Sequence, residues 1–325
     1  MGHGAWDDNA YRAAATFRRA TGKADFAYSA QMRHRPARQW KAAPELDPHG
    51  VTVREARDGA DHPNSTPIVV LFDVTGSMGV VPQIMQRRLA ELLGLLQRKG
   101  YVQDPQIMFG GIGDADCDRV PLQVGQFESD NRMDEQLRTM FLEGGGGGQK
   151  SESYELATYF IARHTATDAW DKRGRKGYLF LIGDEMNKRG LRAEYIRRVI
   201  GDQVGEDLST EAIYREVQQR WETFFVLPRQ TAYYDDRQVN EHWRNLLGER
   251  LLRLEEPEAV CELIALTVGL LEDSIDLGEG LADLADVGSP HGAAVGKALV
   301  TVGGRPVTVS RGALPAGLDD ADDLR

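Results

Sequence analysis

The sequence predicts an α/β protein built on a three-layer, doubly wound and mainly parallel sheet. Two apolar runs, Ile68–Phe72 and Tyr178–Ile182, are continuous rather than alternating, as expected of strands that are buried on both faces. From Pro67 onward, apolar runs of strand length alternate with amphipathic segments of helix length, which is the pattern of βα units around a parallel sheet. With 41% hydrophobic and 27% charged residues, the 325-residue chain can form a sizeable core.

The first central strand is Ile68–Phe72, and the helix that follows it begins near Pro82 and ends at Gly100. Proline suits this position, because the first turn of a helix leaves its N–H groups unpaired. The strand at Pro121–Phe127 is expected to form an antiparallel hairpin at the edge of the sheet. In chain order, the other elements are a strand at Gln106–Ile112, helices at Met133–Leu142 and Glu152–His164, the strand Tyr178–Ile182, helices near Arg192–Ile200 and Thr210–Gln219, a strand at Thr223–Leu227, and helices near Asn240–Leu247 and Pro257–Leu271.

Three regions are expected along the chain. Residues 1–66 are polar and irregular, with one helix near Asn9–Thr21, and we expect an N-terminal extension that packs on the core. Residues 67–272 carry the βα pattern and form the main domain. Residues 273–325 are poorer in apolar side chains and end in the acidic stretch Asp319–Asp323, which indicates a C-terminal extension with a loosely ordered acidic tail.

Charge and composition exclude several classes of partner. The chain has 39 Lys and Arg against 50 Asp and Glu, and a net charge of −11 repels phosphate backbones, so we expect no nucleic acid partner. The longest apolar stretches are shorter than the ~20 residues of a membrane-spanning helix, so no membrane contact is expected. The N-terminus lacks the basic start and apolar run of a secretory signal, which indicates a cytoplasmic protein. Cys117 and Cys261 lie too far apart to indicate a disulfide framework or a cysteine metal site.

The strongest chemical signal comes directly after the first buried strand, in the segment Asp73-Val74-Thr75-Gly76-Ser77. Asp73, Thr75 and Ser77 alternate, so an extended segment would direct one carboxylate and two hydroxyls toward a common point. These hard oxygens, with few negative charges among them, suit Mg²⁺, or Mn²⁺ in its place, better than Zn²⁺ or Ca²⁺. The alternative is structural, because Ser, Thr and Asp also cap the start of a helix.

A second carboxylate follows the other buried strand, at Asp184. In doubly wound sheets, ligands bind in the crevice beyond the carboxyl ends of the strands. If the two strands are neighbours, Asp73 and Asp184 therefore face the same crevice. This pairing favours a metal site over a capped helix start.

The pattern Asp73-x-Thr75-x-Ser77 resembles the metal-ion-dependent adhesion site of von Willebrand factor type A domains, which have a Rossmann-like fold. The resemblance covers Ile68 to Leu271 in element order. The stretch from Arg57-Asp58 to His62–Pro67, together with the glycine run at Gly144–Gly148, resembles an uncharacterised bacterial branch of the family. It implies that Thr75 and Ser77 bind the metal directly, and that Asp73 and Asp184 hold it directly or through water.

The chain departs from the family pattern at the second metal loop. The family has a Thr there, before a helix, whereas this chain has Gln149-Lys150-Ser151-Glu152-Ser153. Ser151 is the preferred substitute, with Gln149, Glu152 and Ser153 as alternatives.

The resemblance implies a Mg²⁺-dependent adhesion or scaffold module that captures an Asp or Glu carboxylate of a protein partner. An alternative within the family is a scaffold that works with a MoxR-type AAA+ ATPase. A different class is a Mg²⁺-dependent phosphohydrolase or NTPase that uses Asp73 and Asp184 as ligands. We expect no enzyme, because the spacing ties no general base to the site.

Two other motifs are incomplete. The segment Gly144–Ser151 approaches the P-loop pattern, but Gln149 replaces its last glycine, and the segment follows a predicted helix instead of a strand. The alternating acids Asp114, Asp116 and Asp118 resemble the start of a Ca²⁺ loop, but the glycine and the glutamate that such a loop requires are missing. We interpret these acids as a turn that lies at the rim of the crevice.

Overall fold

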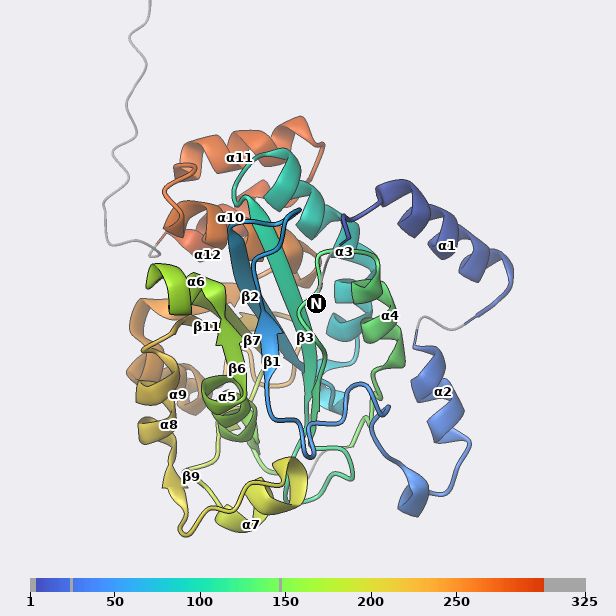
Figure 1. Ribbon diagram of the computed structural model, residues 1–325, viewed down its shortest axis with the longest axis vertical. Helices are drawn as coiled ribbons and strands as arrows, with labels where there is room; N and C mark the ends of the chain where they lie inside the picture. Colours follow the sequence, from blue (N-terminus) through green and yellow to red (C-terminus); the bar gives the residue numbers. More distant parts are fainter. Residues whose placement is uncertain (1–3, 24–25, 146–147, 301–325) are drawn as a thin grey trace, which may run out of the picture.

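The structure is a computed structural model that describes residues 4–23, 26–145 and 148–300 (Figure 1). Within these ranges, the main sheet has six strands in the order β12-β11-β7-β2-β3-β4. The first five strands of this order run parallel, and β4 pairs antiparallel with β3 at one edge. The predicted fold class, a mainly parallel sheet with one antiparallel edge strand, is therefore confirmed.

The strands of the main sheet are β2 (Ser65–Asp73), β3 (Asp104–Ile112), β4 (Leu122–Val124), β7 (Gly177–Ile182), β11 (Trp221–Pro228) and β12 (Leu251–Leu254). The short strands outside it form the pairs β1 (Arg54–Ala56) with β6 (Thr165–Thr167), β5 (Ser151–Glu152) with β8 (Met186–Asn187), and β9 (Gly190–Leu191) with β10 (Leu208–Ser209). The α-helices are α1 (Asp8–Ala20), α2 (Ala27–Arg33), α3 (Val81–Arg98), α4 (Arg132–Thr139), α5 (Tyr154–Arg163), α6 (Asp168–Arg173), α7 (Ala193–Tyr195), α8 (Thr210–Val217), α9 (Arg237–Leu247), α10 (Val260–Leu271), α11 (Leu277–Asp286) and α12 (Gly292–Leu299).

Helices cover both faces of the sheet, and β2 shows why its apolar run is continuous. Ile68, Val70 and Phe72 pack in one core with α3 and α10. Val69 and Leu71 point to the opposite face and pack in a second core with α5, α8 and α9. Because successive side chains of a strand point to opposite faces, a strand between two helical layers needs apolar residues at every position.

The element boundaries differ from the prediction in places that matter for the site. The predicted helix at Glu152–His164 begins only at Tyr154, because Ser151 and Glu152 pair with β8 instead. The edge strand β12 was not predicted, since a run of four residues fits a strand or a helix equally well. The predicted helix at Arg192–Ile200 consists of α7 and a π-helical turn.

Segments on both sides of the main domain pack against it. In the N-terminal segment, Arg18 of α1 forms a buried ion pair of 2.9 Å with Asp134 of α4. At the other end, α11 and α12 bury Leu284, Val295 and Leu299 in the core that contains α10. Residues 301–325, with the acidic stretch, lie outside the described residues. Across the described ranges, each helix is too short or too polar to cross a membrane.

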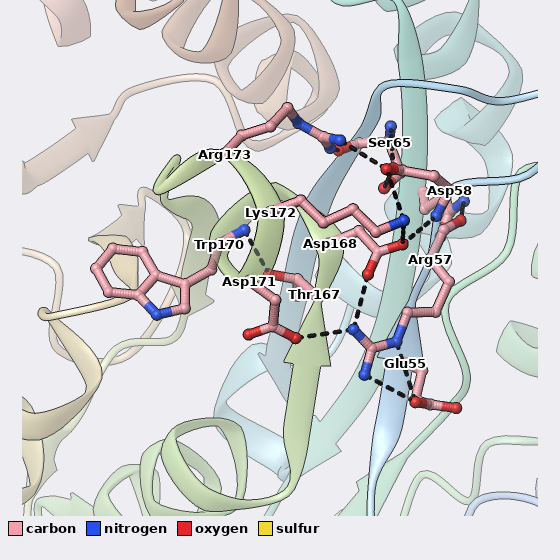
Figure 2. Close-up of polar contacts among 11 residues, drawn as sticks. Glu55, Arg57, Asp58, Ser65, Thr167, Asp168, Trp170, Asp171, Lys172 and Arg173 are labelled. Carbon is pink, nitrogen blue, oxygen red and sulfur yellow. Dashed lines mark hydrogen bonds and ion pairs between the residues drawn. The ribbon is translucent and has the colours of Figure 1, made fainter.

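A charged network fixes the start of β2 to α6 (Figure 2). Ser65, the first residue of β2, donates its hydroxyl to Asp58 at 2.7 Å, and Arg173 of α6 donates to the same carboxylate at 2.7 Å. Arg57 donates to Asp168 of α6 at 2.8 Å. Burial alone would raise the pKa of Asp58, but the hydrogen bonds from Arg173 and Ser65 lower it below its ordinary value.

We predict that Asp58→Asn lowers the free energy of unfolding at pH 7 by ~1–3 kcal/mol, because Arg173 loses its charged partner. The pKa of Asp58 is depressed in the folded chain, so its stabilising effect is present above the unfolded pKa and is lost as the pH falls. In urea unfolding, the free energies of unfolding of the wild type and Asp58→Asn should therefore differ at neutral pH and become equal in acid. Asp171→Asn is the control, since that side chain is 44% exposed and should matter less. Equal stability of Asp58→Asn and the wild type at pH 7 would contradict the assignment.

Candidate metal site

The two buried strands of the prediction are neighbours in the sheet. β2 and β7 pair in parallel, and Phe72 lies opposite Ile182. Asp73 and Asp184 therefore leave the sheet at the same edge, one residue beyond this pair in β2 and two residues beyond it in β7. Both side chains are fully buried, at 0% exposure. The sequence predicts one crevice for both carboxylates if the two strands are neighbours, and β2 and β7 are neighbours.

The hydroxyls of the motif lie beside these carboxylates. After β2 the chain turns, and the backbone N–H of Thr75 donates to Asp73 Oδ1 at 2.7 Å. Thr75 Oγ1 and Ser77 Oγ are 3.0 Å apart. Burial raises the pKa of Asp184 above its ordinary value, and the nearby Ser77 hydroxyl opposes that shift. Thr75 is buried, whereas Ser77 is half-buried and Gly76 is exposed. The structure thus brings four of the predicted residues together, with the Ser77 side facing solvent.

The second loop contacts the motif mainly through its backbone and through Glu152. The carbonyl of Gly145 accepts a hydrogen bond from Gly76 N at 2.9 Å. Glu152 is 1% exposed, and its carboxylate acts electrostatically on Asp73. Ser153 is fully buried and accepts a hydrogen bond from Ala115 N at 2.9 Å. Of the alternatives for the second-loop ligand, Glu152 is therefore the one linked to Asp73.

The remaining second-loop candidates lie farther from this geometry. Ser151 is half-buried in β5, and within the described ranges no hydrogen bond joins its side chain to Asp73, Thr75, Ser77 or Asp184. Gln149 is exposed. Ser151 as a metal ligand therefore stays a prediction.

Two tyrosines hold the carboxylates in place, and the sequence patterns did not reveal either of them. Tyr154, at the start of α5, donates its hydroxyl to Asp73 Oδ2 at 3.2 Å. The backbone N–H of Tyr233, in the loop after β11, donates to Asp184 Oδ2 at 3.4 Å. The other oxygen, Asp184 Oδ1, is buried and has no hydrogen-bond partner among the described residues. An unsatisfied buried carboxylate oxygen is costly, and a bound cation would relieve that cost.

Further buried acids surround the site, and burial with mutual repulsion raises their pKa values. Asp114, Glu152 and Glu185 are all buried. Glu152 and Glu185 interact electrostatically with Asp73, and Asp114 interacts with both glutamates. Burial and repulsion from its neighbours, Asp73 first among them, raise the pKa of Glu185 to about 8, and the same causes raise the pKa of Glu152. Glu152 Oε2 and Glu185 Oε2 are also buried without a hydrogen-bond partner in the described part of the chain.

One nearby cation is already engaged elsewhere. The ammonium of Lys188 bridges Asp114 at 2.7 Å and Asp116 at 2.5 Å. Asp114 and Asp116 therefore belong to an ion-pair cluster, and Asp118 accepts the backbone N–H of Asp114 at 2.7 Å. These contacts agree with an acidic turn. They leave the carboxylates of Asp73 and Asp184 without a lysine or arginine partner among the described residues.

The donor set fits Mg²⁺ only if the hydroxyls take part. Among the described residues, no three His, Cys, Asp or Glu side chains converge well enough to hold a metal ion by themselves. Thr75 and Ser77 add two hard, neutral oxygens beside Asp73 and Asp184. Such a set suits Mg²⁺, which is bound by few carboxylates and keeps several waters.

Comparisons with known proteins give the following results. No family model matches the sequence, and no curated protein matches it. The pilus adhesin SpaC from Lactobacillus rhamnosus GG has a similar fold, with 12% identity and a TM-score of 0.45, and the match covers 66% of this chain and 31% of SpaC. Proximal thread matrix protein 1 from the mussel byssus matches with 11% identity and a TM-score of 0.42, over 69% of this chain and 47% of that protein. A von Willebrand factor type A structure from Catenulispora acidiphila matches with 12% identity and a TM-score of 0.38, over 63% of this chain and 42% of that one.

The matches span less than half of the length of each of these proteins. The neighbours thus include a von Willebrand factor type A domain and an adhesin, at TM-scores below 0.5. Likenesses at this level carry no argument about function, and the fold class rests on the sheet described above.

Gly183, between β7 and Asp184, is predicted to be essential for the site. A Cβ at this position would lie 1.9 Å from the Tyr154 hydroxyl, so Gly183→Ala must displace the ring that hydrogen-bonds Asp73. Such overpacking should lower the free energy of unfolding by ~1–3 kcal/mol or more. Gly205→Ala is the control, because a Cβ there meets no atom within 4 Å. If denaturant unfolding gives both variants the stability of the wild type, the close contact of Tyr154 with Gly183 is wrong.

Proposed function

We propose that this chain is a protein-binding module of the von Willebrand factor type A kind, which uses Mg²⁺ or Mn²⁺ to capture a carboxylate of its partner. The observation that carries the proposal is the pair of fully buried carboxylates, Asp73 and Asp184, beside two hydroxyls and with one carboxylate oxygen unsatisfied. Buried charges are normally paired or bound to metals, and among the described residues this pair has no cationic side chain.

The proposed ligands are two carboxylates and two neutral hydroxyls. Asp73 and Asp184 attract the cation, while Thr75 and Ser77 add oxygens without adding charge. When bound, Mg²⁺ would supply a positive charge with a coordination position open to an oxygen from outside. The exposed Gly76 and half-buried Ser77 leave that side of the site accessible to a partner surface.

The NTPase alternative has less support. After the glycine run, Ser151 and Glu152 enter β5, whereas a P-loop lies between a strand and a helix. Lys150, the candidate phosphate ligand, forms an ion pair with Asp236 at 2.6 Å. A phosphate would therefore have to compete with this carboxylate.

Ser77→Ala should reduce the affinity for Mg²⁺ and Mn²⁺ below detection in calorimetry, because it removes a neutral ligand oxygen from a set with few donors. Thr139→Ala is a matched control, since this half-buried hydroxyl bonds only a carbonyl of its own helix among the described residues. The fold of both variants should remain intact by circular dichroism. An unchanged metal affinity of Ser77→Ala would remove the site assignment.

Partner capture should require both the metal and Asp73. We expect the immobilised chain to retain its partner in Mg²⁺ or Mn²⁺, and to release it in EDTA or when Asp73→Ala is used. One Asp or Glu of the partner should be indispensable, since a charged contact at the centre of an interface is worth ~2 kcal/mol or more. Capture that survives EDTA and Asp73→Ala would rule out the adhesion mechanism, even with the fold correct.

A further inference from the structure

A cavity is lined in part by the loop whose Tyr233 backbone donates a hydrogen bond to Asp184. This loop runs from the end of β11 to α9. Tyr234, the neighbour of Tyr233, lines the cavity, which has a volume of about 430 Å³. The cavity is bounded by β12, α9 and α12. A volume of this size lies within the range of small-molecule sites.

Four cationic side chains from different elements line this cavity, which we name the arginine cavity. Arg229 follows β11, Arg244 belongs to α9, Arg253 to β12, and Lys297 to α12. They are far apart in the sequence, and only the fold brings them together. The lining also contains the ring of Tyr234, the side chain of Leu251, and three acids, Asp235, Glu249 and Glu255.

Two of these cations form ion pairs among the described residues, and two do not. Arg253 pairs with Asp235 at 2.9 Å, and Lys297 pairs with Glu255. No hydrogen bond or ion pair engages the guanidinium of Arg229 or Arg244 within the part of the chain that the structure describes. The cavity therefore holds two guanidinium groups outside any ion pair of the described residues, of which Arg229 acts electrostatically on Glu255.

The guanidinium groups of Arg229 and Arg253 both lie over the ring of Tyr234. The guanidinium of Arg253 lies 4.3 Å from the ring centroid, and that of Arg229 lies 6.0 Å from it. Contacts of this kind hold a cation over an aromatic face and limit its rotamers.

We propose that the arginine cavity binds the phosphate group of a small phosphate ester. A phosphate group presents three terminal oxygens, and planar guanidinium groups recognise such oxygens with two parallel hydrogen bonds. Arg229, Arg244 and Arg253 supply the donors, whereas Tyr234 and Leu251 supply a partly apolar wall for the organic part. This site is independent of the metal, because none of these side chains belongs to the metal set.

Calorimetry of the full chain in EDTA tests this assignment, with inorganic phosphate and phenyl phosphate as probes. The wild type should bind both probes, and acetate should bind more weakly because it offers fewer oxygens. Arg229→Ala and Arg244→Ala should each weaken the binding of phenyl phosphate about tenfold, the effect of one charged hydrogen bond. Glu249→Gln should strengthen it about threefold, since the substitution removes a negative charge from the lining.

Arg237→Ala is the matched control. Arg237 is on the same helix as Arg244, its side chain is 87% exposed, and it lies outside the lining of the arginine cavity. The Arg237→Ala variant should bind phosphate with the affinity of the wild type. Arg244 is exposed and has no partner in the described residues, so its variant should fold normally. Absence of phosphate binding at millimolar concentration, or equal affinity in all five proteins, would overturn the proposal.

Discussion

Two carboxylates buried at one edge of the sheet are the constraint on which the site depends. Asp73 and Asp184 are both fully buried, and the strands that carry them are adjacent and parallel. Removing one charge from water is costly, and two like charges in one crevice raise that cost further. The geometry is therefore stable only with protons or with a cation, and we propose the cation because two hydroxyls lie beside the carboxylates.

The surroundings keep this arrangement in place rather than neutralising it. Tyr154 supports Asp73, and it can approach only because Gly183 has no side chain. The glycine run accepts a hydrogen bond from the motif backbone through Gly145. Lys188, the nearby cation, is turned toward Asp114 and Asp116. Among the described residues, no lysine or arginine thus pairs with Asp73 or Asp184, and Ser77 beside them is only half-buried.

The sequence predicted the parts of the site that follow from strand patterns. A continuous apolar run identifies a strand between two helical layers, and the first one or two residues after such a run are placed by the sheet itself. The positions of Asp73 and Asp184 could therefore be predicted from the sequence. Glu152, by contrast, lies near Asp73 because Ser151 and Glu152 form the short strand β5, which pairs with β8. A strand of two residues is too short to show a periodic pattern in the sequence. Tyr233 and the arginine cavity also depend on where loops and short edge strands pack, which no local pattern encodes.

The most direct test of the account is a crystal structure grown with Mn²⁺ and measured at the manganese absorption edge. The central claim is that a divalent cation sits among Asp73, Thr75, Ser77 and Asp184. The account predicts an anomalous peak at bonding distance, ~2.1 Å, from the hydroxyls of Thr75 and Ser77. A manganese peak elsewhere, or none at this edge of the sheet at saturating Mn²⁺, would contradict it.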